Sequence, residues 1–80
     1  MDNIVCLREV KRDQRFIVSR VTAQGEVGRR IRDMGLTPGA EGRIVGRAPL
    51  KDPVAIRLRD FTLSLRNNEA DHVFVQLIDA

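Results

Sequence analysis

The stretch Gly28–Ala40, GRRIRDMGLTPGA, decides the fold because it combines a short helix, a helix stop and a turn. Val27, Ile31 and Met34 recur at positions i, i+4 and i+7, the spacing that gives a helix one apolar face. Gly35 follows the last of these residues, where a helix commonly ends in a left-handed conformation that glycine adopts most readily. The stretch therefore predicts a helix of two to three turns that packs on the rest of the chain and ends at Gly35.

Strand patterns surround this helix. Five segments either are rich in β-branched and aromatic residues or alternate between apolar and polar side chains. They are Phe16–Val21, Glu41–Ala48, Val54–Leu58, Phe61–Leu65 and Val73–Ile78. Pro38-Gly39 has the residue preferences of a type II turn and would lead into the second of them. The pattern predicts an all-β fold, a small SH3-like barrel of about five strands with one short α-helix between the first and second long strands.

The cleanest alternation, Val54–Leu65, predicts a hairpin with one face on the core and one in water. Arg59-Asp60 would form its tight turn, with Asp60 taking a positive φ. The connection Asn67–His72 would form one helical turn before the last strand. All three phenylalanines are expected in the core: Phe16, Phe61 and Phe74.

Length and composition indicate a single domain, residues 1–80, with one modest core. No apolar run approaches the ~20 residues of a membrane-spanning helix, and the charged N-terminus does not resemble a signal peptide. A lone cysteine, Cys6, fits a reducing compartment, so we expect a cytoplasmic protein. The net charge of +3 fits either an acidic partner or the solubility of a small β-rich domain, and scattered arginines favour the second.

The sequence predicts neither catalysis nor a bound cofactor or metal. His72 is the only histidine, and a catalytic base needs a nucleophile and an orienting partner. The potential metal ligands Cys6, Glu69, Asp71 and His72 follow no recognisable metal-binding spacing.

Nucleic-acid binding is less favoured because three phenylalanines, with no tyrosine or tryptophan, offer few surfaces on which bases could stack. The same shortage disfavours a groove for proline-rich peptides. Arginine-mediated binding of phosphates, by a nucleic-acid-binding or regulatory small β-barrel, stays open as the alternative. The arginines concerned are Arg29, Arg30, Arg32, Arg43 and Arg47.

Three blocks of the chain together resemble the FeoA family. They are RRIRDMGLTPGA at Arg29–Ala40, RAPLKDP at Arg47–Pro53, and LSLR followed by EA within Leu63–Ala70. Asp13, where a Pro-Gly turn is common, and Lys51, which replaces a common glycine, depart from the pattern. The resemblance implies an SH3-like barrel and a small non-enzymatic accessory or regulatory protein of bacterial ferrous iron transport. Its implied partner is the cytoplasmic part of FeoB, a membrane transporter with a GTPase domain. From the residues themselves we expect no nucleic-acid partner and no direct membrane insertion.

A partner-binding surface is predicted where the helix meets the loop framed by Pro49 and Pro53. Leu50 is an apolar residue at the centre of this stiffened loop, and a rigid loop loses little entropy on docking. An arginine on the helix could also be offered to the GTPase to stabilise transition-state charge. The predicted contact residues are Arg29, Arg30, Ile31, Leu36, Pro49, Leu50 and Lys51.

Overall fold

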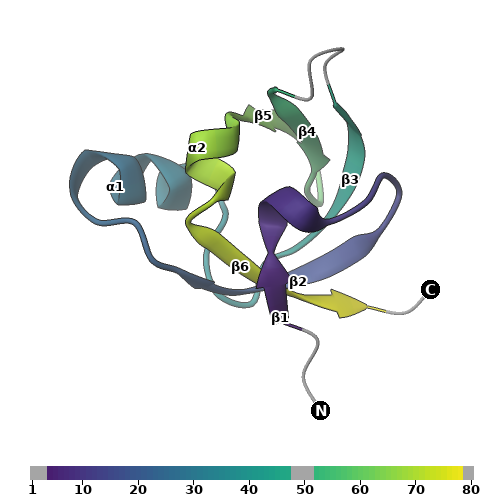
Figure 1. Cartoon of the computed structure of the whole chain (residues 1–80), viewed down its shortest axis with the longest axis horizontal. Helices are drawn as coiled ribbons and strands as arrows, with labels where there is room; N and C mark the ends of the chain where they lie inside the picture. The colour runs from purple at the N-terminus through teal and green to yellow at the C-terminus, as the bar shows by residue number, and fades with distance from the viewer. Residues whose placement is uncertain (1–3, 48–51, 79–80) are drawn as a thin grey trace.

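The computed structural model describes residues 4–47 and 52–78, in which six antiparallel strands form one sheet in the order β1-β6-β2-β3-β4-β5 (Figure 1). The strands are β1 (Ile4–Cys6), β2 (Arg15–Val21), β3 (Glu41–Arg47), β4 (Val54–Arg57), β5 (Thr62–Leu65) and β6 (Val73–Ile78). The predicted all-β architecture is confirmed.

The strand missing from the sequence prediction is β1. It has three residues and pairs with β6, with Val5 opposite Val75 and Cys6 opposite Phe74. A segment this short shows little alternation, so only its pairing partner identifies it as a strand. It makes β6 an inner strand, between β1 and β2.

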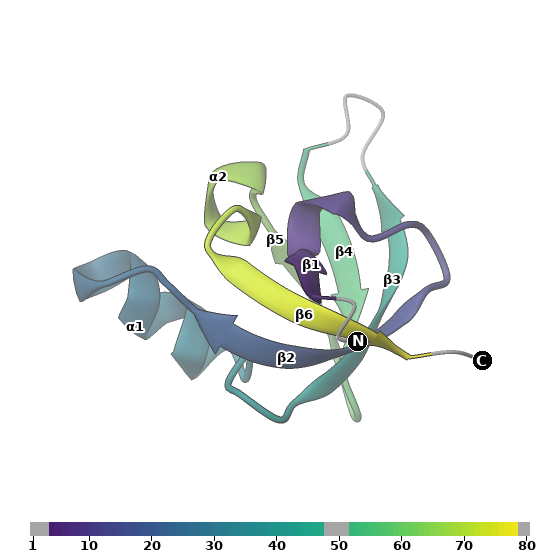
Figure 2. The same cartoon turned by 60° about the horizontal axis from the view of Figure 1, so that its bottom comes forward.

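Three short helices connect the strands: the 3-10 helix η1 (Leu7–Glu9), α1 (Gly25–Asp33) and α2 (Asn67–Ala70). As predicted, α1 lies between β2 and β3, and both views show it at one side of the sheet, with α2 nearer the centre (Figure 2). No helix among residues 4–47 and 52–78 has the length and apolar character needed to cross a membrane.

The predicted helix stop and turn are confirmed. Gly35 has φ +101° and Gly39 has φ +94°, both in the region that side chains rarely adopt. The Ala40 backbone N–H donates to the Thr37 carbonyl oxygen at 2.9 Å and closes the turn around Pro38. The chain therefore reverses tightly between α1 and β3.

The predicted apolar face of the helix is only partly correct. Ile31 is buried, but Val27 is 43% exposed, and Gly28 faces the interior instead. A Cβ on Gly28 would lie 2.3 Å from the carbonyl oxygen of Ala23, so the helix approaches the preceding backbone on its glycine side. This close approach turns Val27 toward solvent.

The bent sheet wraps around one core, which includes Phe16 at its centre and the helix residues Ile31 and Ala70. Its buried apolar residues are Leu7, Val10, Phe16, Val18, Ala23, Ile31, Leu36, Ile44, Val54, Ile56, Leu58, Leu65, Ala70, Val73 and Val75. The register of β3 with β4 shifts between Ile44 and Gly46, as expected for a bulge in a strongly coiled sheet.

Two of the three phenylalanines do not lie where the sequence predicted. Phe61 is 47% exposed, and Phe74 is only partly buried, with the Arg20 guanidinium carbon 5.1 Å from its ring centroid. The cause for Phe61 is the hairpin turn, which spans residues 58–61 rather than two residues. Within it the Leu58 N–H donates to the Phe61 carbonyl oxygen at 2.9 Å, and Asp60 does not adopt a positive φ.

Candidate functional site

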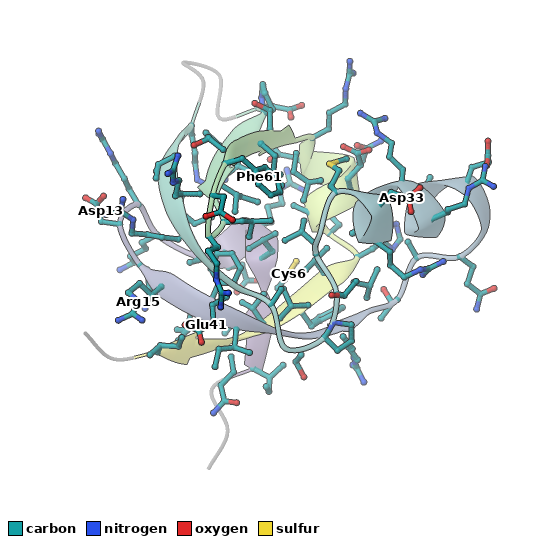
Figure 3. All side chains as sticks on the ribbon, turned by 180° about the vertical axis from the view of Figure 1, so that it is seen from behind. Cys6, Asp13, Arg15, Asp33, Glu41 and Phe61 are labelled. Carbon is teal, nitrogen blue, oxygen red and sulfur yellow. The ribbon has the colours of Figure 1, made fainter. Side chains whose placement is uncertain are left out.

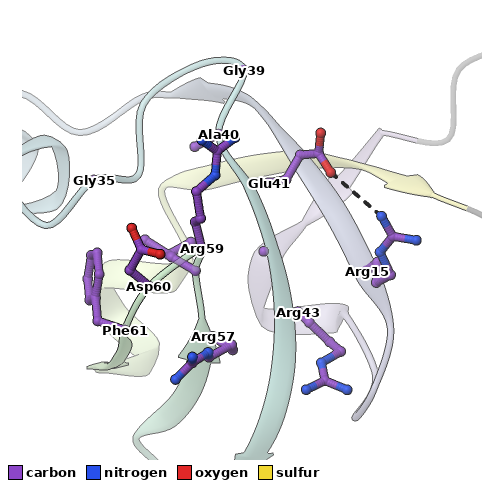
Figure 4. Close-up of a pocket in the computed structure, with 12 residues that line it drawn as sticks. Arg15, Gly35, Gly39, Ala40, Glu41, Arg43, Arg57, Arg59, Asp60 and Phe61 are labelled. Carbon is purple, nitrogen blue, oxygen red and sulfur yellow. Dashed lines mark ion pairs between the residues drawn. The ribbon is translucent and has the colours of Figure 1, made fainter.

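A groove of about 630 Å³ opens between the loop that joins α1 to β3 and the loop that joins β4 to β5 (Figure 4). Strands β2, β3 and β4 complete its walls. Its lining residues are Arg15, Gly35, Gly39, Ala40, Glu41, Gly42, Arg43, Arg57, Leu58, Arg59, Asp60 and Phe61. The groove combines an apolar part with a positively charged part.

The apolar part lies where the helix stop meets the hairpin loop. A Cβ on Gly35 would lie 3.3 Å from Leu58 Cδ1 and 3.7 Å from Phe61 Cζ, so these three residues are close neighbours. Leu58 is buried, whereas Phe61 presents about half of its surface to solvent. Since Phe16 is buried and Phe74 partly buried, Phe61 is the one exposed phenylalanine among the described residues, and the sequence has no tyrosine or tryptophan.

The charged part is a row of arginines across three neighbouring strands. Arg15 on β2 lies opposite Arg43 on β3, and Arg43 lies opposite Arg57 on β4. Residues directly opposite in an antiparallel pair project to the same face of the sheet. We call Arg15, Arg43 and Arg57 the arginine row; all three side chains are exposed.

Carboxylates near the row neutralise it only in part. Arg15 Nη2 lies 3.7 Å from Glu41 Oε1, the ion pair drawn in Figure 4, and both side chains are more than half exposed. Arg57 Nη1 donates to the hydroxyl of Thr62 at 3.3 Å, a neutral partner. Among the described residues no carboxylate forms an ion pair with Arg43, Arg57 or Arg59. The groove therefore carries an excess of positive charge.

The structure corrects the predicted contact residues Ile31 and Leu36. Both are 0% exposed members of the core, so a partner could touch them only if the fold opened. Their apolar character serves the packing of α1 on the sheet. The loop residues Pro49, Leu50 and Lys51 lie outside the described residues.

Arg29 and Arg30 lie on α1 as predicted and are engaged in ion pairs. Arg29 pairs with Glu26 one turn earlier, and Arg30 Nη1 lies 3.1 Å from Glu69 Oε2. The Glu69 side chain is buried and its Oε1 also accepts the Arg66 N–H at 3.0 Å, which caps α2. Arg30 therefore links α1 to α2 through this ion pair. A role of Arg29 or Arg30 in binding a partner stays a prediction.

The side chains considered as metal ligands have other contacts. Asp71 binds Arg8 at 3.2 Å, the Cys6 thiol lies 3.4 Å from the Ala70 carbonyl oxygen, and His72 Nδ1 lies 3.5 Å from Thr22 Oγ1. Figure 3 shows that Cys6 and two further acidic residues, Asp13 and Asp33, lie in different parts of the molecule. Residues 4–47 and 52–78 contain no group of three or more histidine, cysteine or acidic side chains placed to hold a metal ion.

The bent antiparallel sheet, with α1 between β2 and β3, belongs to the class of small SH3-like domains. Within that class, residues 5–77 match the model of the FeoA domain family, and the chain belongs to this family. The resemblance seen in the sequence is thereby confirmed.

Similar proteins agree with this assignment. The Fe(2+) transport protein A/Fe(2+) transporter FeoB fusion protein of Porphyromonas gingivalis is 35% identical over 74 residues, which cover 92% of this chain and 9% of the fusion protein. The FeoA-like protein of Clostridium acetobutylicum superposes with a TM-score of 0.90 at 38% identity, covering 100% of this chain and 93% of that one. The FeoA of Stenotrophomonas maltophilia, described as an SH3 domain protein complexed with zinc, has a TM-score of 0.77 at 28% identity, covering 89% and 88%. The predicted SH3-like fold is confirmed.

Proposed function

We propose that this chain is a small, non-enzymatic accessory protein of ferrous iron transport that binds the cytoplasmic part of a FeoB-type transporter. The observation that carries the proposal is the Porphyromonas gingivalis relative, whose name joins a transport protein A to the transporter FeoB in one fusion protein. Fusion holds two domains at a high effective concentration, whereas a separate chain has to reach its partner by binding. A cytoplasmic location is part of this proposal.

The architecture suits a binding role. The groove lies on a scaffold in which the helix stop, the hairpin loop and three strands are held together by the core. Preorganised surfaces lose little entropy on association. The contact between Thr22 and His72 supports a structural rather than a catalytic role, because the Thr22 N–H and hydroxyl also bind the His72 carbonyl oxygen at 2.7 and 3.3 Å. This residue pair joins the chain just after β2 to the chain just before β6.

A direct test measures binding between the purified chain and the purified cytoplasmic part of the FeoB-type transporter of the same organism. The proposal predicts a saturable complex by calorimetry. It also predicts that deleting the chain's gene lowers ferrous iron uptake and that the wild-type gene restores it. Absence of a complex at high micromolar concentrations, together with unchanged uptake after deletion, would rule the proposal out.

A further inference from the structure

We propose that the groove binds an acidic segment of a protein partner, whose carboxylates pair with the arginine row while one apolar side chain packs on Phe61. The inference takes its class of partner from the proposed function and adds the surface and the chemistry of the contact. It moves the predicted interface from the α1 face and residues 49–51 to the two loops that border the groove.

The arginine row places like charges side by side on neighbouring strands. Like charges directly opposite one another on neighbouring strands destabilise a sheet, and the pairs Arg15–Arg43 and Arg43–Arg57 both have this arrangement. The row therefore lowers the stability of the isolated fold. Anionic groups that bind across the row relieve this repulsion, which favours their binding. The carboxylates of an acidic ligand attract all three guanidinium groups and offset their mutual repulsion.

The spacing of the row matches an extended peptide. Neighbouring strands lie about 4.8 Å apart, so the row spans about 10 Å, and side chains on one face of an extended peptide recur about every 7 Å. Two carboxylates at alternate positions of a bound segment would then lie within reach of three flexible guanidinium groups. Arg59, in the adjoining loop, adds a further positive charge at the groove.

The apolar part supplies the anchor. Phe61 is about half exposed beside the buried Leu58 and the glycine backbone at Gly35. A Cβ placed on Gly39 would meet no atom within 4 Å, so this wall of the groove is open to an incoming side chain. Aromatic anchors surrounded by polar groups commonly supply most of the binding energy at interfaces.

A nucleic acid fits the groove less well than a peptide. Base stacking along a single strand needs several aromatic platforms, and Phe61 is the one aromatic residue among those that line the groove. The groove also contains the carboxylates of Glu41 and Asp60, which repel a continuous phosphate backbone. A peptide can place isolated carboxylates over the arginines and leave these two positions uncharged.

The test is a two-dimensional NMR titration of the 15N-labelled chain with a short synthetic peptide in which glutamates alternate around one central leucine. We expect amide shifts at Gly35, Gly39, Gly42 and Phe61 that saturate with added peptide. Peptides with glutamine for glutamate, or serine for leucine, should bind roughly tenfold more weakly or worse. Equal shifts with the glutamine peptide, or shifts confined to other surfaces, would overturn the inference.

Variants of the chain test the charged part and the apolar part of the groove separately. Arg43→Glu and Phe61→Ser should each weaken peptide binding at least about tenfold, while Arg12→Glu, the same charge change outside the groove lining, should keep near wild-type affinity. A thymidine oligonucleotide that binds the same residues more tightly than the acidic peptide would also overturn the inference.

If the transporter binds wild-type and Arg43→Glu equally, the inference fails and the proposed function stands. If the acidic peptide binds at the groove but the transporter does not, the proposed function fails separately.

Discussion

Arg43 on β3 lies directly opposite Arg57 on β4, so two like charges project side by side from the same face of the sheet. Arg15 extends the row on the other side of Arg43, and its carboxylate contact with Glu41 is 3.7 Å long and solvent-exposed. Solvent-exposed ion pairs of this kind contribute little, at most about 1 kcal/mol. The repulsion within the row is therefore only partly relieved in the isolated chain.

Replacing Arg43 should stabilise the fold. Arg43→Glu converts two repulsive neighbours into two attractive ones and should raise the free energy of unfolding by about 0.5–1.5 kcal/mol at low salt, from ~0.2–1 kcal/mol per cross-strand pair. Arg43→Gln, which removes the charge at nearly the same size, should give a smaller gain. Urea denaturation of the wild type, Arg43→Glu and Arg43→Gln measures the order of their free energies of unfolding.

Salt provides the control for this prediction. At 1 M salt the Debye length is about 3 Å, so the differences between the three proteins should shrink. A gain that persists unchanged at high salt would mean that Arg43 was strained by packing and not by neighbouring charge.

The surface position of Phe61 predicts a separation of stability and binding. Phe61→Ser should lower the free energy of unfolding by only about 1 kcal/mol, because roughly half of the ring is already in water. Phe16→Ala, in the fully buried centre of the core, should cost about 3–5 kcal/mol. Thermal melts compare the stability of the two variants. If Phe61→Ser lost as much stability as Phe16→Ala, the Phe61 ring would lie in the core.

The two glycines of the α1–β3 connection should respond differently to alanine. Both have positive φ, so Gly35→Ala and Gly39→Ala each introduce backbone strain of about 1–3 kcal/mol. Gly35→Ala should cost more, because its Cβ would lie 3.3 Å from Leu58 Cδ1, whereas the Cβ of Gly39→Ala meets nothing within 4 Å. Equal losses in parallel denaturant titrations would contradict the close packing at Gly35.

The link between the helices can be tested at Glu69. Glu69→Ala removes the acceptor for the Arg66 N–H and the partner of Arg30, and it should cost about 1–3 kcal/mol because the carboxylate is buried. Arg30→Ala should cost less, since Arg30 is largely exposed. In a double-mutant cycle the two losses should not add, and strict additivity would show that the pair does not couple the helices.

Local signals in the sequence predicted much of the fold. Gly35 and Gly39 marked the helix stop and the turn because those conformations depend on the residue itself. The alternation around Val54–Arg57 placed β4 correctly because its period of two reports burial directly. By contrast, β1 is too short to show a period, and it depends on pairing with β6.

The groove could not be predicted in the same way. Arg15, Arg43 and Arg57 lie on three strands far apart in the sequence, and only the register brings them together. Phe61 continues an apolar alternation but falls in a four-residue loop, so its pattern wrongly indicated the core. Ile31 and Leu36 were assigned to a partner surface because an apolar helix face does not reveal whether a sheet or another protein covers it.

The most direct measurement is an NMR titration of the 15N-labelled chain, wild type and Arg43→Glu, with the unlabelled cytoplasmic part of the FeoB-type transporter. We expect that wild-type shifts and line broadening concentrate at residues 35–43 and 57–61, and that Arg43→Glu, although folded and more stable, loses them. Perturbations confined to the outer face of α1 around Arg29 and Val27, and identical in the two proteins, would contradict it.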